Sequence, residues 1–171
     1  MTRILKDQGY IEICGILITI ADSSGLNERI TAAISGGDKI SITYCNANTV
    51  NRIIGDKSLL PMINSFDIIH PDGTGIFLAS KFLFGSLGPR KRFSGSDYYR
   101  YLIDLALKFK LKIFFFGHDE NTLKKISIKN PGLHIAGYQS GYDYSDEKVI
   151  SLVNQSNPDI LVVGLGFPVQ E

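Results

Sequence analysis

The stretch "DIIHPDGTG", residues 67–75, joins an apolar run to a turn and then to a helical pattern. The run at residues 66–70 is short and almost continuously apolar, which is typical of a strand covered on both faces. Pro71 stiffens the chain after the strand, and residues 73–84 have the pattern of a helix. The stretch therefore predicts one strand–turn–helix unit, with the carboxylate of Asp72 at the carboxyl end of the strand.

The same unit recurs along the chain, because short apolar runs alternate with helix-length segments. This alternation predicts parallel βαβ units with right-handed crossovers. We therefore expect one domain, residues 1–171, with a Rossmann-like α/β fold: a mainly parallel sheet with helices on both faces. The expected strands are 39–45, 66–70, 111–117, 133–137 and 158–166, and the expected helices are 24–35, 73–84, 96–110, 119–129 and 145–155.

Length and composition set the broad class of protein. The chain has 171 residues, 44% hydrophobic and 20% charged, as in a globular domain with a real core. The net charge of +1 gives no reason to expect a nucleic-acid partner. Cys14 and Cys45 form no C-x-x-C pair, which favours a reducing compartment. Residues 11–21 are too short to span a membrane and are interrupted by Glu12, so they predict a pair of short strands.

Glycine follows several of the predicted strands, at positions 73, 75, 117, 137, 164 and 166. In an open parallel sheet the ligand crevice lies at the carboxyl ends of the strands. Glycine there, Gly117 included, allows backbone N–H groups to approach a phosphate closely, and helix N-termini add favourable dipoles. The alternative is that these residues serve turn geometry alone.

Phosphate-binding and catalytic motifs of other enzyme classes do not occur in the sequence. The dinucleotide fingerprint lacks its third glycine, and there is neither a P-loop nor a nucleophile elbow. The three histidines show no metal-ligand spacing, so we expect neither a metal ion nor a cofactor. The sequence "HDE" at residues 118–120 is better explained as a turn that caps a helix.

Asp72 has two interpretations from the residues alone. Asp is a favoured N-cap, and a helix is expected from residue 73, so a cap is the favoured interpretation. A partly desolvated carboxylate at a strand end near an anionic ligand is also suited to act as a general base. Asn46 follows the preceding predicted strand in the same way. Its two interpretations are a second helix cap and a residue that binds sugar hydroxyls.

A basic loop precedes the segment expected to form the helix at residues 96–110. Arg90, Lys91 and Arg92 stand in "GPRKRFSGSD" just before a serine-capped helix start. Arginine together with the N-terminus of a helix can form a phosphate-binding site. A solvated basic loop is the alternative, and it is the favoured one from the residues alone.

Several motifs together resemble the WecG/TagA/CpsF family of bacterial glycosyltransferases. They are "NANTVN", "PDGTG", "RFSGSD", "FFFG", "GY" at residues 141–142 and "PDILVVGLGFPVQE", in the family's order, and the likeness runs from about residue 13 to residue 171. The resemblance implies transfer of an N-acetylmannosamine-type sugar from a UDP donor to a sugar on undecaprenyl diphosphate. It places that reaction at the cytoplasmic face of the bacterial inner membrane, in surface polysaccharide or teichoic acid biosynthesis.

The resemblance also assigns roles to individual residues. Asp72 matches the family's proposed catalytic base, and Asn46 matches the asparagine of its T-x-N motif. Substrate contacts are implied for the matching positions and their neighbours, and Tyr142 is expected near the nucleotide. The implied substrate-binding residues are Tyr44, Asn46, Arg92, Asp97, Gly117, Tyr142 and Gln170. Because Asn46, Asp72 and Gln170 each follow a predicted strand, we expect them to converge on one cleft.

The chain departs from the family pattern in two ways. Tyr44 stands where threonine is common, Phe167 and Val169 replace the usual residues of the last motif, and Ser140 replaces a frequent histidine; these changes bear on the identity of the donor sugar. Family members also continue past the last motif into a further strand and a basic, membrane-engaging appendage. We therefore expect peripheral membrane contact in a full-length form, and little or no activity from the 171 residues alone.

Three functions stay open at this stage. The leading hypothesis is an inverting UDP-sugar-dependent hexosyltransferase in which Asp72 deprotonates the acceptor hydroxyl. The second is a catalytically inactive remnant that binds UDP-sugar. The third is a nucleotide-dependent oxidoreductase, which the missing fingerprint disfavours. The sequence leaves homo-oligomer formation open.

Overall fold

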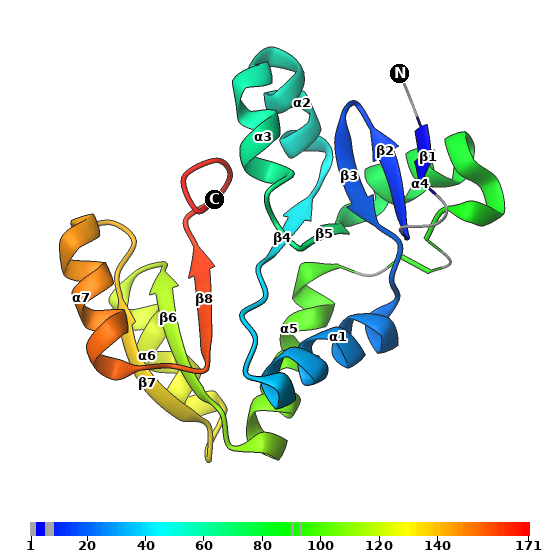
Figure 1. Cartoon of the computed structure of the whole chain (residues 1–171). Helices are drawn as coiled ribbons and strands as arrows, with labels where there is room; N and C mark the ends of the chain where they lie inside the picture. The colour runs from blue at the N-terminus through cyan, green and yellow to red at the C-terminus, as the bar shows by residue number, and fades with distance from the viewer. Residues whose placement is uncertain (1–2, 6–8, 90, 93) are drawn as a thin grey trace. The chain divides into compact units, whose positions relative to one another are not determined.

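Helices and strands alternate along most of the chain (Figure 1), in a computed structural model that describes residues 3–5, 9–89, 91–92 and 94–171. The α/β class is confirmed, since parallel strand pairs are connected through helices. The chain divides into two compact units, residues 1–98 with Glu171 and residues 99–170. The prediction that they form one domain stays a prediction.

The first unit begins with an antiparallel three-stranded sheet, β1-β2-β3. β2 and β3 are the pair of short strands expected from residues 11–21. Ile13 pairs with Ile16, and the two residues between them, Cys14 and Gly15, have φ values of 54° and 91°. Positive φ at both positions matches the two-residue hairpin turns that follow the twist of their strands. The strands are β1 (Arg3–Leu5), β2 (Tyr10–Ile13) and β3 (Ile16–Thr19).

A parallel pair, β4-β5, forms the second sheet of this unit and carries the candidate site. All four residues of β5 are buried, as its continuous apolar run predicts. The backbone N–H of Ile69 donates to Oγ1 of Thr19 at 3.1 Å, which ties β5 to β3. The elements are α1 (Ser23–Gly36), β4 (Ile42–Cys45), α2 (Ala47–Gly55), η2 (Lys57–Leu59), α3 (Leu60–Ile63), β5 (Ile68–Pro71), α4 (Gly73–Phe84) and η3 (Gly85–Leu87).

Helix α5 (Gly95–Phe109) begins in the first unit, and its later residues belong to the second. The second unit contains a parallel sheet of order β7-β6-β8, with β6 in the centre. Ile113, Phe114 and Phe115 of β6 are at most 3% exposed and form its core. The remaining elements are β6 (Lys112–Gly117), α6 (Glu120–Lys129), β7 (His134–Gln139), α7 (Asp146–Ser156) and β8 (Ile160–Gly164).

All five predicted strands and all five predicted helices are present within a few residues of their expected bounds. One glycine assignment is wrong, because Gly137 lies inside β7 rather than after it. A Cβ on Gly137 would come within 2.8 Å of the Phe114 ring, so this glycine makes room for a core side chain. Strand β1 and helices α2 and α3 were not predicted.

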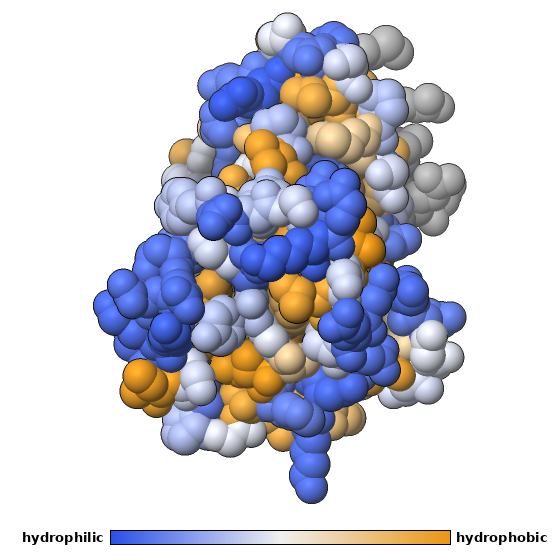
Figure 2. Space-filling model, turned by 90° about the vertical axis from the view of Figure 1, so that its left-hand side faces the viewer, coloured by the Kyte–Doolittle hydropathy of each residue, from blue (hydrophilic) through white to orange (hydrophobic). Residues whose placement is uncertain are grey.

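Hydrophobic residues also reach the surface. Ile128 of α6 and Ile150 of α7 are 79% and 60% exposed. Figure 2 shows hydrophobic residues in separate patches between hydrophilic ones on the face that it draws. Single exposed hydrophobic residues are common in proteins. An apolar patch therefore indicates an interaction surface only when a second property distinguishes it.

Candidate active site

The carboxyl ends of β4 and β5 lie next to each other. In the parallel register Cys45 pairs with Pro71, and the N–H of Asp72 donates to the carbonyl oxygen of Cys45 at 2.8 Å. Asn46 and Asp72 are the residues that directly follow this last pair. The structure therefore brings together two predicted site residues that are 26 positions apart in the sequence.

Asn46 is the N-cap of helix α2. Its Oδ1 accepts a hydrogen bond from the N–H of Thr49 at 3.1 Å, and the N–H of Asn46 donates to Oγ1 of Thr49 at 3.4 Å. This is a reciprocal capping box, which satisfies backbone donors that the first helical turn leaves without partners. The cap uses the side-chain oxygen and leaves the amide nitrogen Nδ2 outside it.

Asp72 stands at the equivalent position before α4, but its side chain does not cap that helix. Its Oδ1 instead accepts a hydrogen bond from the N–H of Gly95, at 3.0 Å. Gly95 is the first residue of α5, so the carboxylate binds the start of a helix that is distant in sequence. The interpretation of Asp72 as the cap of the following helix is therefore wrong.

Tyr44 packs beside this carboxylate. Its ring meets His70 edge-on, with 5.9 Å between ring centroids, and a Cβ on Gly95 would lie 3.3 Å from Cε1 of Tyr44. Burial raises the pKa of Tyr44 to about 12, and the negative charge of Asp72 adds to the effect. The phenol therefore keeps its proton at neutral pH and remains a hydrogen-bond donor.

The thiol nearest to this site is unsuited to nucleophilic chemistry. Burial raises the pKa of Cys45 to about 12, with smaller contributions from Cys14 and Asp72. A thiol needs its ionised form to attack, and at neutral pH Cys45 is protonated. The chemistry available at this strand end is therefore that of the Asp72 carboxylate.

The start of α5 is held by a second capping box. Oδ2 of Asp97 accepts from the N–H of Ser94 at 3.1 Å and from its hydroxyl at 2.7 Å, and the N–H of Asp97 donates to Oγ of Ser94 at 3.2 Å. Asp97 thus stabilises the turn that presents the Gly95 N–H to Asp72. Arg92, just before this turn, is exposed, and Arg90 lies outside the described residues.

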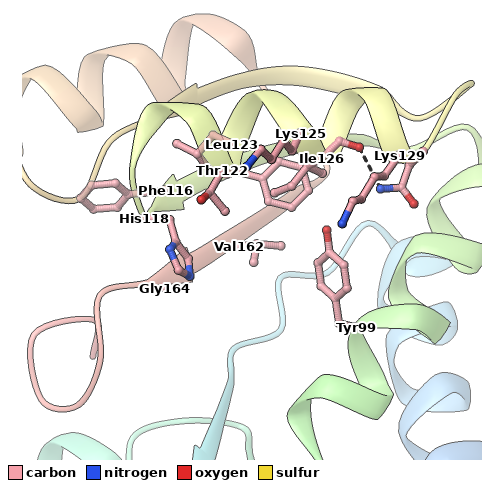
Figure 3. A pocket seen from close by; sticks show the side chains of 13 residues that line it. Tyr99, Phe116, His118, Thr122, Leu123, Lys125, Ile126, Lys129, Val162 and Gly164 are labelled. Carbon is pink, nitrogen blue, oxygen red and sulfur yellow. Dashed lines mark hydrogen bonds between the residues drawn. The ribbon is translucent and has the colours of Figure 1, made fainter.

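The second unit has its own hollows at the carboxyl end of its sheet. The larger, with a volume of about 410 Å³, lies against β6, β8 and α6, and Gly117 is part of its lining. In Figure 3, His118 and Thr122 lie toward one end and Tyr99 and Lys129 toward the other. A smaller hollow of about 130 Å³ is lined by His118, Gly141, Tyr142, Gly164 and Leu165.

The two hollows share His118 and Gly164, so Gly117 and Tyr142 lie close to the same strand ends. A Cβ on Gly117 would come within 2.5 Å of the carbonyl oxygen of Gly164, and its φ is +134°. No other residue type fits there, which explains this glycine by packing alone. Tyr142 is 81% exposed, so its ring is accessible to a ligand.

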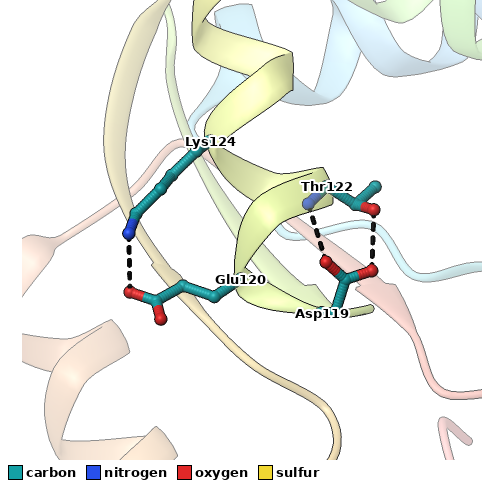
Figure 4. A network of polar contacts seen from close by, with 4 residues as sticks. All are labelled: Asp119, Glu120, Thr122 and Lys124. Carbon is teal, nitrogen blue, oxygen red and sulfur yellow. Dashed lines mark hydrogen bonds and ion pairs between the residues drawn. The ribbon is translucent and has the colours of Figure 1, made fainter.

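Asp119 caps helix α6, as the sequence predicted. Its Oδ1 accepts from the N–H of Thr122 at 3.0 Å and its Oδ2 from the Thr122 hydroxyl at 2.7 Å (Figure 4). Glu120 forms an ion pair with Lys124 one helical turn later, at 3.2 Å. Across the residues that the structure describes, no three His, Cys, Asp or Glu side chains gather as metal ligands would.

Gln170 lies in a turn after β8. Its Oε1 accepts from the N–H of Gly166 at 3.0 Å, and the N–H of Val169 donates to the Gly166 carbonyl oxygen at 2.9 Å. Gln170 belongs to the second unit, whereas Asn46 and Asp72 belong to the first. The convergence of these three residues on one cleft stays a prediction.

Sequence comparisons identify the family of the chain. A model of the glycosyl transferase WecG/TagA/CpsF family matches residues 11–171. The chain belongs to the WecG/TagA/CpsF family. It is 34% identical over 161 residues to an N-acetylglucosaminyldiphosphoundecaprenol N-acetyl-beta-D-mannosaminyltransferase of Bacillus spizizenii (strain ATCC 23059 / NRRL B-14472 / W23), covering 85% of this chain and 61% of that protein.

Two other relatives extend the comparison. The protein of the same name from Bacillus subtilis (strain 168) is 32% identical over 134 residues, covering 76% of this chain and 52% of the relative. A UDP-Gal:alpha-D-GlcNAc-diphosphoundecaprenol beta-1,4-galactosyltransferase of Shigella boydii is 30% identical over 151 residues. The match covers 85% of this chain and 59% of that protein. The chain thus spans little more than half the length of these relatives. Among the residues that the structure describes, no helix is long and apolar enough to cross a membrane.

Proposed function

We propose that this chain is part of a UDP-sugar-dependent hexosyltransferase that transfers an N-acetylmannosamine-type sugar to an acceptor on undecaprenyl diphosphate. The family and the names of the Bacillus relatives support this substrate class. The Shigella relative is named for galactose, so the donor sugar is the least constrained part of the proposal. We place the reaction at the cytoplasmic face of the bacterial inner membrane, in surface polysaccharide or teichoic acid biosynthesis.

The observation that carries the proposal is the state of Asp72. The Asp72 carboxylate makes no capping hydrogen bond to α4. It is partly buried at a strand end, and its Oδ1 accepts a hydrogen bond from the N–H of Gly95. A residue that served only as a cap would bind the first turn of α4. A carboxylate held by a neighbouring helix start is instead fixed in orientation, as a general base must be.

The proposed reaction is a single displacement. Oδ2 of Asp72 takes the proton of the acceptor hydroxyl while that oxygen attacks the anomeric carbon of the donor sugar. The bond between the anomeric carbon and the diphosphate oxygen breaks, and its electron pair leaves with UDP. One displacement inverts the configuration at the anomeric carbon.

Substrate contacts are assigned to the other candidate residues. Nδ2 of Asn46 and the Tyr44 hydroxyl can donate to sugar oxygens, and Arg92 to the diphosphate. In the second unit we assign nucleotide contacts to the backbone at Gly117 and to the exposed ring of Tyr142, with Gln170 near the donor sugar. Neutralisation of the leaving diphosphate by N–H groups and arginine would provide the electrostatic stabilisation.

Two measurements test the proposal. Calorimetry with UDP-N-acetylmannosamine, UDP-galactose and NAD identifies the ligand class, and we expect binding of a UDP-sugar and not of NAD. A single-turnover assay with undecaprenyl-diphosphate-linked N-acetylglucosamine and excess protein then detects even slow transfer. Binding without any transfer would identify the chain as a UDP-sugar-binding remnant, and binding of NAD alone would favour an oxidoreductase.

A further inference from the structure

Helix α4 presents hydrophobic side chains on its solvent side as well as toward the core. Ile76 and Phe84 are buried, as expected for its inner face. Leu78, Phe82 and Leu83 are 58%, 90% and 46% exposed, and we call them the outer stripe. Leu78 and Phe82 are four residues apart and so lie one above the other on the helix. An exposed phenylalanine beside two exposed leucines is the kind of apolar patch that marks an interaction surface.

The charge of this part of the chain is also unusual. Residues 73–96 contain four basic residues, Lys81, Arg90, Lys91 and Arg92, and no acidic residue. The chain as a whole has 18 basic and 17 acidic residues, so the rest of it is net negative. The outer stripe therefore lies within the strongly basic segment of an otherwise acidic chain.

Two described residues of the segment after α4, Gly88 and Gly95, are fixed near the helix or the residue before it. A Cβ on Gly88 would lie 3.0 Å from the carbonyl oxygen of Ser80, in the second half of α4, and the N–H of Gly95 bonds Asp72, just before its first residue. Lys91 and Arg92 lie between these two points and are exposed. Lys91 and Arg92 therefore belong to a segment that lies close to Ser80 of α4 at one end and to Asp72, the residue before α4, at the other.

Lys81 adds a cation from the helix itself. Its ammonium lies 5.8 Å from the centroid of the Phe77 ring, one turn before it. α4 thus combines exposed apolar groups with cations on the helix and on the adjacent loop. Exposed apolar side chains that enter the interface and cations that attract anionic lipids are the two contributions to peripheral membrane binding.

We propose that α4, together with Lys91 and Arg92, docks on an anionic phospholipid bilayer. The outer stripe enters the interface between headgroups and acyl chains, and Lys81, Lys91 and Arg92 contact the headgroups. Asp72 directly precedes α4, so docking would place the base near a lipid-linked acceptor; this consequence rests on the proposed function. The contact is peripheral, because α4 has only 12 residues.

Charge decides between a bilayer and a second copy of the chain as the partner of this surface. In a two-fold symmetric dimer the same patch meets itself, so the cations around one stripe would approach those around the other. An anionic lipid surface neutralises the same cations and attracts each of them. The bilayer is therefore the partner whose charge complements the patch.

The test is flotation of the 171-residue chain with vesicles. We expect binding to vesicles containing about 30 mol% phosphatidylglycerol in phosphatidylcholine, weak binding to phosphatidylcholine alone, and release at about 0.5 M salt. Phe82→Ser should weaken the binding about tenfold, because it removes the largest apolar side chain from the interface. A Lys91→Gln/Arg92→Gln variant should weaken it roughly 30-fold on the anionic vesicles.

Matched controls use exposed residues elsewhere in the chain. Ile128→Ser removes a side chain that is 79% exposed on α6, and Lys108→Gln/Lys110→Gln removes two exposed cations near the end of α5. Both controls should bind vesicles like the unaltered chain, and circular dichroism should show that every variant is folded.

Two results would overturn the proposal. One is equal vesicle binding by the Phe82→Ser and Ile128→Ser variants. The other is sedimentation equilibrium showing that Phe82→Ser dissociates a dimer while vesicle binding is unchanged, which would assign the outer stripe to a second copy. The vesicle assay contains no sugar nucleotide, so its outcome is independent of the calorimetric test of donor binding.

Discussion

The strand ends after β4 and β5 are adjacent, and each carries a polar residue at the N-cap position of a helix. Asn46 uses its side-chain oxygen to cap α2, within a reciprocal pair of bonds to Thr49. Asp72 makes no such bond to α4 and instead binds Gly95, 23 positions later. The difference shows that two residues in equivalent local positions can use their side chains differently: Asn46 caps its own helix, and Asp72 binds the start of another.

The substitution with the largest expected effect is Asp72→Asn. The amide oxygen can still accept from Gly95, so the free energy of unfolding should change by less than about 0.5 kcal/mol. The amide cannot take a proton from the acceptor, so in a form that spans the full length of the relatives the single-turnover rate should fall about 10²–10⁴-fold while UDP-sugar binding persists. Stopped assays of UDP release and urea unfolding measure the two effects. A variant that transfers sugar at the unaltered rate would remove Asp72 as the base.

The reciprocal change is Asn46→Asp. Aspartate caps a helix as well as asparagine does, so the cap of α2 should be kept. The change removes the donor Nδ2 and adds a negative charge beside Asp72, so UDP-sugar binding should weaken about tenfold by calorimetry. Unchanged affinity would show that Asn46 has only its structural role.

Asn46→Ala tests the cap itself. Loss of the side-chain oxygen should lower the free energy of unfolding by about 1 kcal/mol, because the N–H of Thr49 loses its acceptor. Asn48→Ala is the matched control, since Asn48 is exposed within the same helix. Urea unfolding of both variants measures the difference. An equal loss in the control would mean that the capping box contributes little.

The smallest expected effect concerns Asp67, just before β5. Hydrogen bonds from the N–H and the hydroxyl of Ser41, at 2.8 and 2.7 Å, lower the pKa of the Asp67 carboxyl. The ionised group therefore stabilises the fold above the unfolded pKa of about 3.9, and this contribution is lost as the pH falls through the lower folded value.

Asp67→Asn should therefore lower the stability by a constant amount between about pH 5 and 7, and the difference from the unaltered chain should shrink below about pH 4. Urea unfolding of both proteins across this range measures it. The exposure of Asp67 keeps the effect small. A difference that is the same at every pH would mean that the charge of Asp67 does not contribute.

The order of elements was predictable because it depends on local patterns. The apolar run of β6 and the helical pattern of α4 are visible in the sequence, since burial of a strand or of one helix face imposes its period on neighbouring residues. The cap of α6 by Asp119 was predictable for the same reason, because its partner Thr122 is three residues away.

The partner of Asp72 was decided only by tertiary structure. The residue type favoured a local cap, and nothing within a few positions of Asp72 indicates that its carboxylate binds Gly95. That bond exists because a capping box at Ser94 and Asp97 fixes the start of α5 beside the end of β5. The sequence by itself thus determined most of the elements, their order and the family. The hydrogen-bond partner of the Asp72 side chain depended on contacts between distant segments. Such contacts produce no periodic pattern in the sequence.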